Sequence, residues 1–284
     1  MHRFVPFSIN RKGELIEFSR PQVMGILNIT PDSFYAESRA TEEKSIASRI
    51  EQIISEGANI IDIGAYSSRP GAETIPADEE YRRLGLGIKI LRSIDSHILV
   101  SVDTFRADVA RKAIEELDAD IINDISGGDI DEKMFETVAQ LNVPYILMHM
   151  RGTPENMATM TDYANVTVEV IKSLADKVNR LALLGVNDVI VDPGFGFSKT
   201  IEQNYELLNN LEIFHELDRP LLVGVSRKSM IYKPLNSTPQ EALNGTTVLN
   251  TIALLAGASI LRVHDVKEAV EAIKLVELTQ HNNK

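Results

Sequence analysis

Residues 22–34 read QVMGILNITPDSF and join an apolar run to a polar loop. The run from Val23 to Leu27 has the length and β-branched content of a strand that is buried on both faces. It ends at Asn28 and continues as a Thr-Pro-Asp-Ser loop, whose residue types also suit an ordinary turn. A buried strand that ends in a polar side chain and opens into a long loop is also typical of the catalytic rim of an α/β barrel. The rest of the chain favours the second interpretation.

The same alternation of an apolar run and a helical segment repeats along the chain. Further strands are predicted at residues 58–64, 98–103, 120–125, 144–149, 189–192, 220–225 and 259–263. Helices are predicted at residues 42–57, 78–95, 107–116, 133–141, 166–184, 201–211, 242–255 and 266–278. Eight strand–helix units without a linker predict a single domain, residues 1–284, folded as a (β/α)8 TIM barrel that begins at about residue 22. Residues 1–20 are expected to form a short strand or hairpin cap with its turn at Gly13.

The composition excludes several classes of protein and of site. The 284 residues are 44% hydrophobic and 25% charged, as in a globular protein, and the absence of cysteine excludes disulfides, thiolate metal sites and cysteine nucleophiles. The net charge of −12 argues against a broad nucleic-acid surface. No stretch is apolar enough to span a membrane, and the first residues lack the apolar core of a signal peptide. We therefore expect a cytoplasmic protein that binds neither nucleic acid nor membranes.

Polar side chains stand where nearly every predicted strand ends. They are Asn28, Asp62, Asp103, Asn123, His149, Asp192, Ser226, Arg227, Lys228, Arg262 and His264. In a barrel the carboxyl ends of the strands converge on one mouth, so this set predicts a polar pocket there. For Asp62 and His149, direct contact with a ligand and a supporting role that holds other residues are equally good interpretations.

One group in this set suits a flat heterocycle. Asp103, Asn123, Asp192 and Lys228 offer carboxylate acceptors, an amide with donor and acceptor, and an ammonium donor. A carboxylate can accept hydrogen bonds from a ring nitrogen and its exocyclic amine, while a lysine donates to the ring carbonyl. The group therefore predicts recognition of an amino-pyrimidinone edge.

A second group suits an anion. Donors and cations dominate among Asn28, Arg69, Arg262 and His264, which favours phosphate or pyrophosphate. Arg69, in the loop after the second strand, could instead be a solvated surface arginine. Residues 226–229 begin a helix-forming turn whose backbone N–H groups could hold a carboxylate.

Three common site types fit these residues less well. The glycines of residues 194–199, GFGFSK, have the wrong spacing for a Walker loop or a dinucleotide fingerprint. The six histidines include no pair with metal-ligand spacing. A Schiff-base role for Lys228, as in an aldolase-like barrel, is the less favoured alternative for that residue.

Seven short motifs, taken together and in order, resemble dihydropteroate synthase. They lie at residues 28–34 (NITPDSF), 68–71 (SRPG), 102–104 (VDT), 123–124 (ND), 192–197 (DPGFGF), 226–229 (SRKS) and 262–264 (RVH). The resemblance runs from about residue 22 to the last predicted helix. The first and fifth motifs also recur in related pterin-binding methyltransferases.

This resemblance implies an enzyme of folate synthesis that condenses (7,8-dihydropterin-6-yl)methyl diphosphate with 4-aminobenzoate to give 7,8-dihydropteroate and pyrophosphate. It assigns the pterin pocket to Asp103, Asn123, Asp192 and Lys228, lined by Ile125, Met148 and Phe197. It assigns pyrophosphate to Asn28, Ser68, Arg69, Arg262 and His264, with Mg²⁺ held by Asn28 and the pyrophosphate oxygens. It assigns 4-aminobenzoate to Phe34, Pro70, Lys228 and Ser229, and catalytic roles to Asp103, Lys228, Arg69 and Asp32. It further implies a homodimer and a sulfonamide target.

One loop departs from the family pattern. Residues 64–69 read GAYSSR where the family commonly has GGESTR. Ser68 keeps a hydroxyl where threonine is usual, so an anion contact is retained, whereas Tyr66 replaces glutamate.

The implied reaction needs no dedicated base, because an arylamine is already neutral at pH 7. Its demanding step is C–O cleavage, which builds charge on pyrophosphate and on the pterin methylene, so we expect an SN1-like path with electrostatic stabilisation of the leaving group. Two alternatives share the pterin pocket. A methyltransferase that uses a reduced folate has no use for Arg69, Arg262 and His264 as a pyrophosphate clamp. A non-catalytic pterin-binding paralogue need not keep loops that contain Asn28 and Asp32.

Overall fold

The fold is given by a computed structural model, which describes residues 4–29, 36–66 and 75–281, without the side chains of residues 36–41. The barrel strands are β3 (Gln22–Asn28), β4 (Ile60–Gly64), β5 (Leu99–Asp103), β6 (Ile121–Asp124), β7 (Tyr145–Met148), β8 (Val189–Asp192), β9 (Leu222–Val223) and β10 (Ile260–Val263). The helices are α1 (Ala36–Ser55), α2 (Ala77–Ile94), α3 (Ala107–Leu117), α4 (Met134–Leu141), α5 (Val166–Leu183), α6 (Ile201–Asn209), α7 (Ser229–Tyr232), α8 (Leu243–Leu255) and α9 (Val266–His281).

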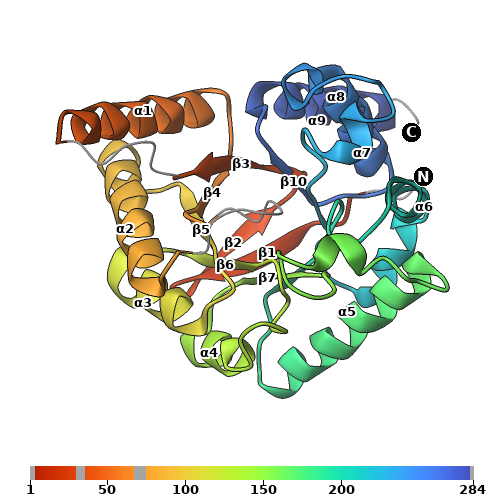
Figure 1. Cartoon of the computed structure of the whole chain (residues 1–284), viewed down its shortest axis with the longest axis horizontal. Helices are drawn as coiled ribbons and strands as arrows, with labels where there is room; N and C mark the ends of the chain where they lie inside the picture. The colour runs from red at the N-terminus through yellow and green to blue at the C-terminus, as the bar shows by residue number, and fades with distance from the viewer. Residues whose placement is uncertain (1–3, 30–35, 67–74, 282–284) are drawn as a thin grey trace.

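The strands form one parallel sheet that curls into a barrel. The eight strands follow the order β8-β7-β6-β5-β4-β3-β10-β9, and a parallel bridge between Val191 and Leu221 joins the two ends. The helices surround the strands, as Figure 1 shows. The predicted (β/α)8 barrel is therefore confirmed. None of the described helices is both long and apolar enough to cross a membrane.

The observed elements differ from the predicted ones mainly at their ends. Helix α1 begins at Ala36 rather than at residue 42, because the intervening Ala, Glu and Arg favour helix. Helix α6 ends at Asn209, and a 3₁₀ helix (Leu211–Leu217) follows it. At the junction the Glu206 carbonyl oxygen accepts from both the backbone N–H (3.1 Å) and the side chain (2.8 Å) of Asn210. Strand β9 is shorter than residues 220–225, since a turn from Val225 to Lys228 follows it directly.

The inside of the barrel has an apolar layer below a polar one. Side chains alternate along a strand, so every second residue faces inward. The apolar layer consists of Met24, Ile60, Leu99, Ile121, Ile146, Ile190, Leu222 and Ile260, with Ile9 and Phe18 packed against it. Two residues further along their strands stand Asp62, Ser101, Asn123, Asp192 and Arg262. The alternation that buries the apolar layer therefore also turns these polar side chains inward, nearer the carboxyl ends.

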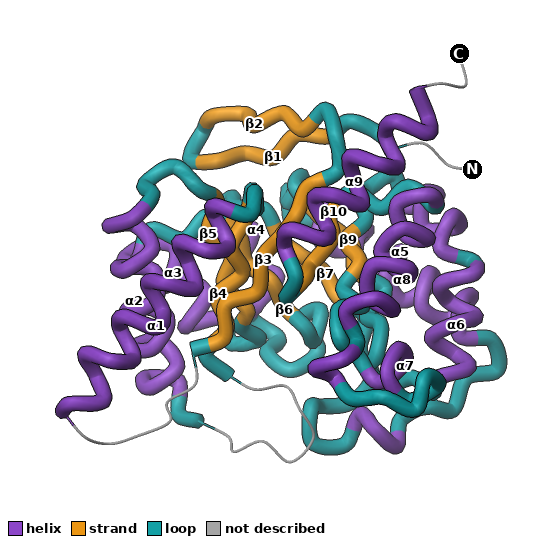
Figure 2. The backbone as a smooth tube through the Cα atoms, turned by 90° about the horizontal axis from the view of Figure 1, so that it is seen from above, coloured by secondary structure: helices purple, strands orange, loops and turns teal. Residues whose placement is uncertain are grey.

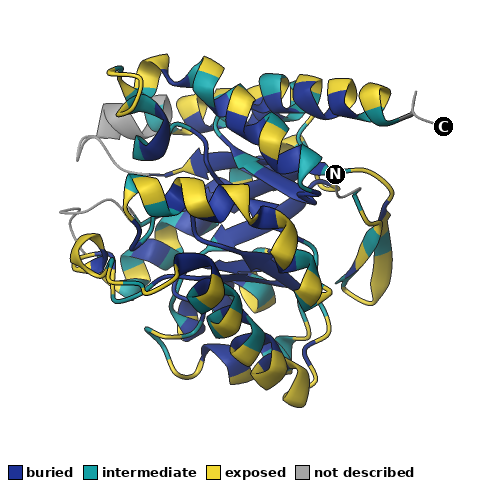
Figure 3. Cartoon of the chain, turned by 90° about the vertical axis from the view of Figure 1, so that its right-hand side faces the viewer, coloured by how far each residue is buried: buried dark blue, intermediate teal, exposed yellow. Residues whose placement is uncertain are grey.

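The outward faces of the strands pack against the helices in a second apolar core. Figure 3 shows this division, with buried strands and inner helix faces and exposed outer helix faces. Helix α3 is an example, since Val109, Ala110 and Ala113 are buried at helical spacing.

The N-terminal hairpin closes the end of the barrel that lies away from the carboxyl ends (Figure 2). Strands β1 (Phe7–Arg11) and β2 (Glu14–Phe18) pair antiparallel around a two-residue turn in which Lys12 and Gly13 have φ of 53° and 92°. The predicted hairpin with its turn at Gly13 is therefore confirmed. The Asn10 N–H donates to Asp188 (2.7 Å), which ties the hairpin to the start of β8.

The fold predicts that Asp120 stabilises the hairpin end of the barrel. Its buried carboxylate accepts from Arg11 Nε (3.0 Å), Arg92 Nη2 (2.8 Å) and the Val100 N–H (2.9 Å). Asp120→Ala leaves the buried Val100 N–H unpaired and removes the carboxylate that Arg11 and Arg92 share, so thermal or urea unfolding should show a loss of about 3–5 kcal/mol. Asp118→Ala is the matched control, because Asp118 also pairs with Arg92 but its side chain is 54% exposed; we expect a loss below about 1 kcal/mol. Equal losses in the two variants would contradict this account.

Candidate active site

Four strands bring their ends into one row at the mouth of the barrel. Asn28, Gly64, Asp103 and Asn123 are neighbours in the register of β3, β4, β5 and β6. A Cβ added to Gly64 would lie 3.4 Å from Asn28 Oδ1 and 3.6 Å from the Asp103 Cβ. The glycine thus leaves the space between these two side chains open.

Arg262 connects the polar side chains inside the barrel. Its Nε donates to Asp62 Oδ2 (2.6 Å) and its Nη2 to Asp103 Oδ2 (2.8 Å). The same Asp62 oxygen accepts from Asn123 Nδ2 (3.0 Å). Asp62 is 0% exposed. Of its two predicted roles, the structure therefore favours that of a residue that holds others.

Burial dominates the acid–base behaviour of this group. Burial raises the pKa of Asp103 to about 7, although the charge of Arg262 opposes the rise and that of Asp62 adds to it. Burial also raises the pKa of Asp192, against the opposing charge of Lys228. The two aspartates thus attract protons, or ligand N–H groups that take the place of protons, more strongly than exposed carboxylates do.

Lys228 precedes α7, on the segment after β9, and its side chain lies against the loop that follows β8. Its Nζ donates to the Phe195 carbonyl oxygen and stands 4.5 Å from the centroid of the Phe197 ring. Burial lowers the pKa of Lys228 to about 8, although the charge of Asp192 opposes this. Asp192 itself accepts from the Gly194 N–H (2.7 Å), so the loop also fixes one of its oxygens. Lys228 and Asp192 are therefore organised by the same loop.

An apolar wall stands beside these polar groups. Ile125, Met148 and Phe197 belong to one cluster, which is separate from the two cores of the barrel and also contains Phe105, Ile130, Met150 and Met157. The structure therefore brings together the three apolar residues that the family resemblance assigns to one pocket. Asp124 supports this wall, because its carboxylate accepts from Ser126, Gly128 and Tyr145 and so holds the loop after β6.

Of the residues predicted to bind the anion, the structure describes Asn28, Arg262 and His264. Burial lowers the pKa of His264 to about 4, so its ring is neutral at pH 7, and its backbone N–H donates to Ser226 Oγ (3.1 Å). Arg227 forms a two-bond ion pair with Asp265 (2.7 and 2.9 Å), which gives it a structural role. Ser229 begins α7 and is half-buried. Arg262 was predicted to bind the anion, but its guanidinium contacts Asp103, which was predicted to bind the pterin. The two predicted binding groups therefore meet at this side chain.

Several predicted site residues lie outside the described part of the chain. They are Asp32, Phe34, Ser68, Arg69 and Pro70. Tyr66, which replaces the usual glutamate, is described. Its ring packs edge-on against Phe105 (centroids 5.2 Å apart), with the Arg106 guanidinium 5.9 Å from it.

The sequence analysis missed Lys199. This lysine follows the glycine-containing loop of residues 194–198, and its side chain turns under that loop to donate to Gly194 O (2.9 Å) and Phe197 O (3.1 Å). Its Nζ is also 3.2 Å from His149 Nδ1, so His149 takes the supporting role. In the sequence, the only available signal was a lysine directly after a loop that contains two glycines.

The described residues include no group of three or more His, Asp and Glu side chains that could hold a metal ion. Mg²⁺ does not need such a group, because it commonly binds one protein oxygen together with substrate phosphate oxygens and water. Asn28 is exposed at the end of β3 with its Oδ1 beside Gly64. Its amide oxygen therefore fits the Mg²⁺ that the family resemblance implies.

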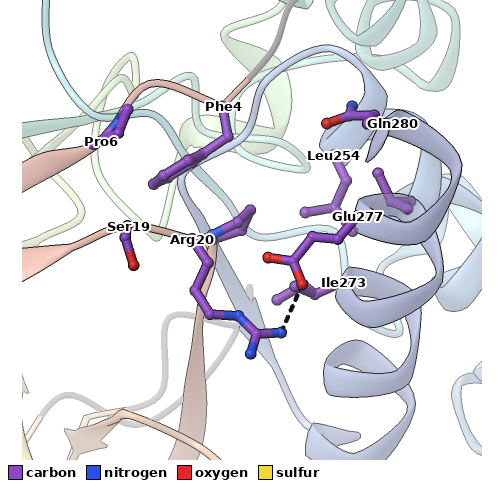
Figure 4. Close-up of a pocket in the computed structure, with 10 residues that line it drawn as sticks. Phe4, Pro6, Ser19, Arg20, Leu254, Ile273, Glu277 and Gln280 are labelled. Atoms are coloured by element: carbon purple, nitrogen blue, oxygen red, sulfur yellow. Dashed lines mark hydrogen bonds and ion pairs between the residues drawn. The ribbon is translucent and has the colours of Figure 1, made fainter. Parts of the chain in front are cut away.

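A second hollow lies at the hairpin end of the barrel (Figure 4). It has a volume of about 440 Å³ between the hairpin flanks and helices α8 and α9. Its lining is largely apolar, and its charged groups, Arg20 and Glu277, pair with each other at 2.9 Å. Convergent polar groups are found at the mouth instead, so the mouth is the better candidate for chemistry.

Comparison with known proteins agrees with this location. The family model described as "Pterin binding enzyme" matches residues 24–264. Dihydropteroate synthase of Escherichia coli is 40% identical over 272 residues, covering 94% of this chain and 95% of that protein. Dihydropteroate synthase of Yersinia pestis, solved with a sulfonamide drug, aligns with a TM-score of 0.88 and 38% identity, covering 97% of this chain and all of that one. The Xanthomonas albilineans enzyme, solved with 4-aminobenzoic acid, gives a TM-score of 0.87 and 34% identity over 96% of this chain and 98% of that one.

The charge balance at the mouth predicts how Asp103 titrates. In the protein without ligand, NMR of the carboxyl carbon should give a pKa of about 7 for Asp103. Asp62→Asn should lower that pKa, because the negative charge of Asp62 raises it in the wild type. The exposed Asp118, whose pKa is lowered by Lys12 and Arg92 despite some burial, is the internal control. Titration of Asp103 at about 4, as in a model peptide, would contradict this electrostatic account.

Proposed function

The chain belongs to the dihydropteroate synthase family of pterin-binding enzymes, and on this premise we propose that it joins (7,8-dihydropterin-6-yl)methyl diphosphate to 4-aminobenzoate, giving 7,8-dihydropteroate and pyrophosphate. As a member of this family it is an enzyme of folate synthesis. The Xanthomonas albilineans enzyme has been solved with 4-aminobenzoic acid and with 7,8-dihydropteroate, which supports these substrates. The observation that carries the proposal is the convergence of Asp103, Asn123, Asp192 and Lys228 beside one apolar wall.

The pterin edge would be read by charged and amide groups. Asp192 accepts from the ring N–H and the exocyclic amine, and Lys228 donates to the ring carbonyl. Asn123 already donates its Nδ2 to Asp62 (3.0 Å), so its Oδ1 is the atom left to accept from the ligand. Asp103 provides a further acceptor. Each charge-assisted bond contributes about 1.5–3 kcal/mol, so a few of them specify the ligand.

Departure of pyrophosphate sets the electrostatic demand on the site. Arg262, His264, Arg69 and Ser68 would bind its oxygens, and the guanidinium groups would stabilise the charge that develops as the C–O bond breaks. Asp103 and Asp192 would favour the positive charge on the pterin, which makes the path SN1-like. Asn28 would hold Mg²⁺, which supplies further charge neutralisation to the leaving group when bound.

The arylamine then attacks the pterin methylene without a dedicated base. The site for 4-aminobenzoate would consist of Phe34, Pro70, Lys228 and Ser229. Asp32, to which the family resemblance gives a catalytic role, stands two residues before Phe34 in the sequence. The Yersinia pestis enzyme has been solved with a sulfonamide drug, so we extend the proposal to sulfonamides as competitors for this site.

Arg262 and His264 also support this reaction over its alternatives. A cation that contacts Asp103 at 2.8 Å would stand next to a bound pterin, where the diphosphate would leave. A methyltransferase that uses a reduced folate, or a protein that only binds pterin, has no anion to place there. The synthase is therefore the function that this geometry supports best.

We also propose that the enzyme works in the cytoplasm as a homodimer. The location rests on the cysteine-free sequence alone. The dimer is supported by α8, which buries Leu249 and Ala253 against the barrel yet exposes Val248 and Ile252 (50% and 41%) on its other side. A helix that is apolar on both faces is usually covered on both, and a second copy of the chain would cover this one.

The proposed function predicts a balanced two-product reaction. Purified protein with both substrates and Mg²⁺ should release pyrophosphate and 7,8-dihydropteroate in equal amounts. Asp192→Asn should lower kcat/KM for the dihydropterin substrate, with a loss of about 2–3 kcal/mol in binding free energy, because an amide cannot accept both N–H bonds at full strength. Asp176→Asn, on the exposed face of α5, is the control and should change nothing. Absence of pyrophosphate release from the wild type would contradict the assignment, and methyl transfer from a reduced folate would favour the alternative.

A further inference from the structure

Lys199 is a buried lysine without a carboxylate partner in the described part of the chain. It is 9% exposed. Its Nζ has three contacts: Gly194 O at 2.9 Å, Phe197 O at 3.1 Å and His149 Nδ1 at 3.2 Å. An ammonium group has three N–H donors, so these three acceptors use its full capacity. Burial lowers the pKa of Lys199 to about 7, although the charge of Asp192 opposes this, so the charged form is disfavoured here and the three contacts offset part of that cost.

The contacts of Lys199 join the two ends of one loop. Gly194 and Phe197 lie on either side of Gly196, and both glycines have positive φ (73° and 79°). A Cβ on Gly194 would lie 2.0 Å from His149 O and 3.4 Å from the Lys199 Nζ. The loop therefore turns tightly around the Lys199 amine, and His149, the residue directly after β7, contacts it from the other side. Burial lowers the pKa of His149 to about 2, which keeps the ring neutral with an acceptor available.

Lys228 lies on the opposite side of the same loop. A Cβ on Gly196 would come within 2.9 Å of Lys228 Cδ, so the lysine stem rests directly on the loop backbone. The Lys228 ammonium group contacts the Phe195 carbonyl oxygen and the Phe197 ring (4.5 Å). No ion pair holds Lys228 among the described residues, so this loop is its main directing partner.

We propose that Lys199 is a positioning residue of the pterin site, which fixes residues 193–198 in the conformation that directs Lys228 and Asp192 toward the ligand. This inference rests on the proposed function, because it assumes that Lys228 and Asp192 contact the pterin. Lys199 itself does not touch the substrate. It acts through Phe195 and Phe197, which contact Lys228, and through Gly194, whose N–H holds Asp192 (2.7 Å).

The first test uses the protein without ligand. Lys199→Met keeps the length and apolar stem of the side chain but removes all three donors. We expect faster amide hydrogen exchange in residues 194–198, and no change in the strands. Leu207→Ala is the control, because Leu207 is a fully buried residue of α6 in the outer core and its truncation destabilises the fold without removing a hydrogen bond to the loop. Unchanged loop exchange in Lys199→Met, or an equal increase in both variants, would overturn the proposal.

The second test asks whether Lys199 acts through Lys228. Calorimetric titration with 6-hydroxymethylpterin should show a loss of affinity of about tenfold or more for Lys199→Met, since misplaced binding groups have effects of this size. Lys228→Met should also weaken binding, and the double variant should lose less affinity than the sum of the two single losses, because only the route through Gly194 and Asp192 remains once Lys228 is gone. Additive losses would show that Lys199 acts independently of Lys228 and would overturn the proposed route.

The two tests also separate this inference from the proposed function. A wild type that binds no 6-hydroxymethylpterin would contradict the pterin site and, with it, the role of Lys199 in that site. A wild type that binds the pterin while Lys199→Met keeps wild-type affinity and loop exchange would leave the synthase function standing and reject the role of Lys199.

Discussion

The bond between Arg262 and Asp62, 2.6 Å long and inside the barrel, is the interaction that connects the polar side chains of four strands. Asp62 Oδ2 also accepts from Asn123 and the arginine also donates to Asp103, so one pair orients side chains from β4, β5, β6 and β10. Asp62 Oδ1 is buried without a hydrogen-bond partner among the described residues, so the protein keeps this pair at a cost in desolvation free energy. The apolar layer and the hairpin below it exclude water from the base of this polar group.

Much of this arrangement could be predicted from the sequence, because it follows from alternation and repetition. Eight apolar runs separated by helical segments predicted the barrel, and the polar residues at the ends of these runs predicted a polar pocket at its mouth. The apolar wall is a different case. Ile125, Met148 and Phe197 are ordinary hydrophobic residues in the sequence, and only the family resemblance placed them together. Their common cluster in the structure agrees with that resemblance.

The rest could not be predicted, because it depends on which distant residues share one small volume. The positive charge of Arg262 predicted that it binds the anion. Its position two residues after Ile260, on the inward face of β10, also brings it to the carboxylates of two other strands. Lys199 is the extreme example. Its three acceptors are His149 Nδ1, just after β7, and the carbonyl oxygens of Gly194 and Phe197 in the preceding loop. No spacing of residues in the sequence predicts these contacts. The ends of α1, β9 and α6 were misplaced for a smaller reason, since local turns and helix propensity decide them.

A crystal structure with 7,8-dihydropteroate bound would test the central role of the Arg262–Asp62 pair most directly. The account predicts that the two Asp62 contacts persist, to Arg262 and to Asn123, while Asp103 exchanges Arg262 for the pterin. The Arg262 donor released in this way would face the pyrophosphate side of the pocket. A complex in which Arg262 leaves Asp62, or in which the pterin binds away from Asp103 and Asn123 while their contacts stay as they are, would contradict it.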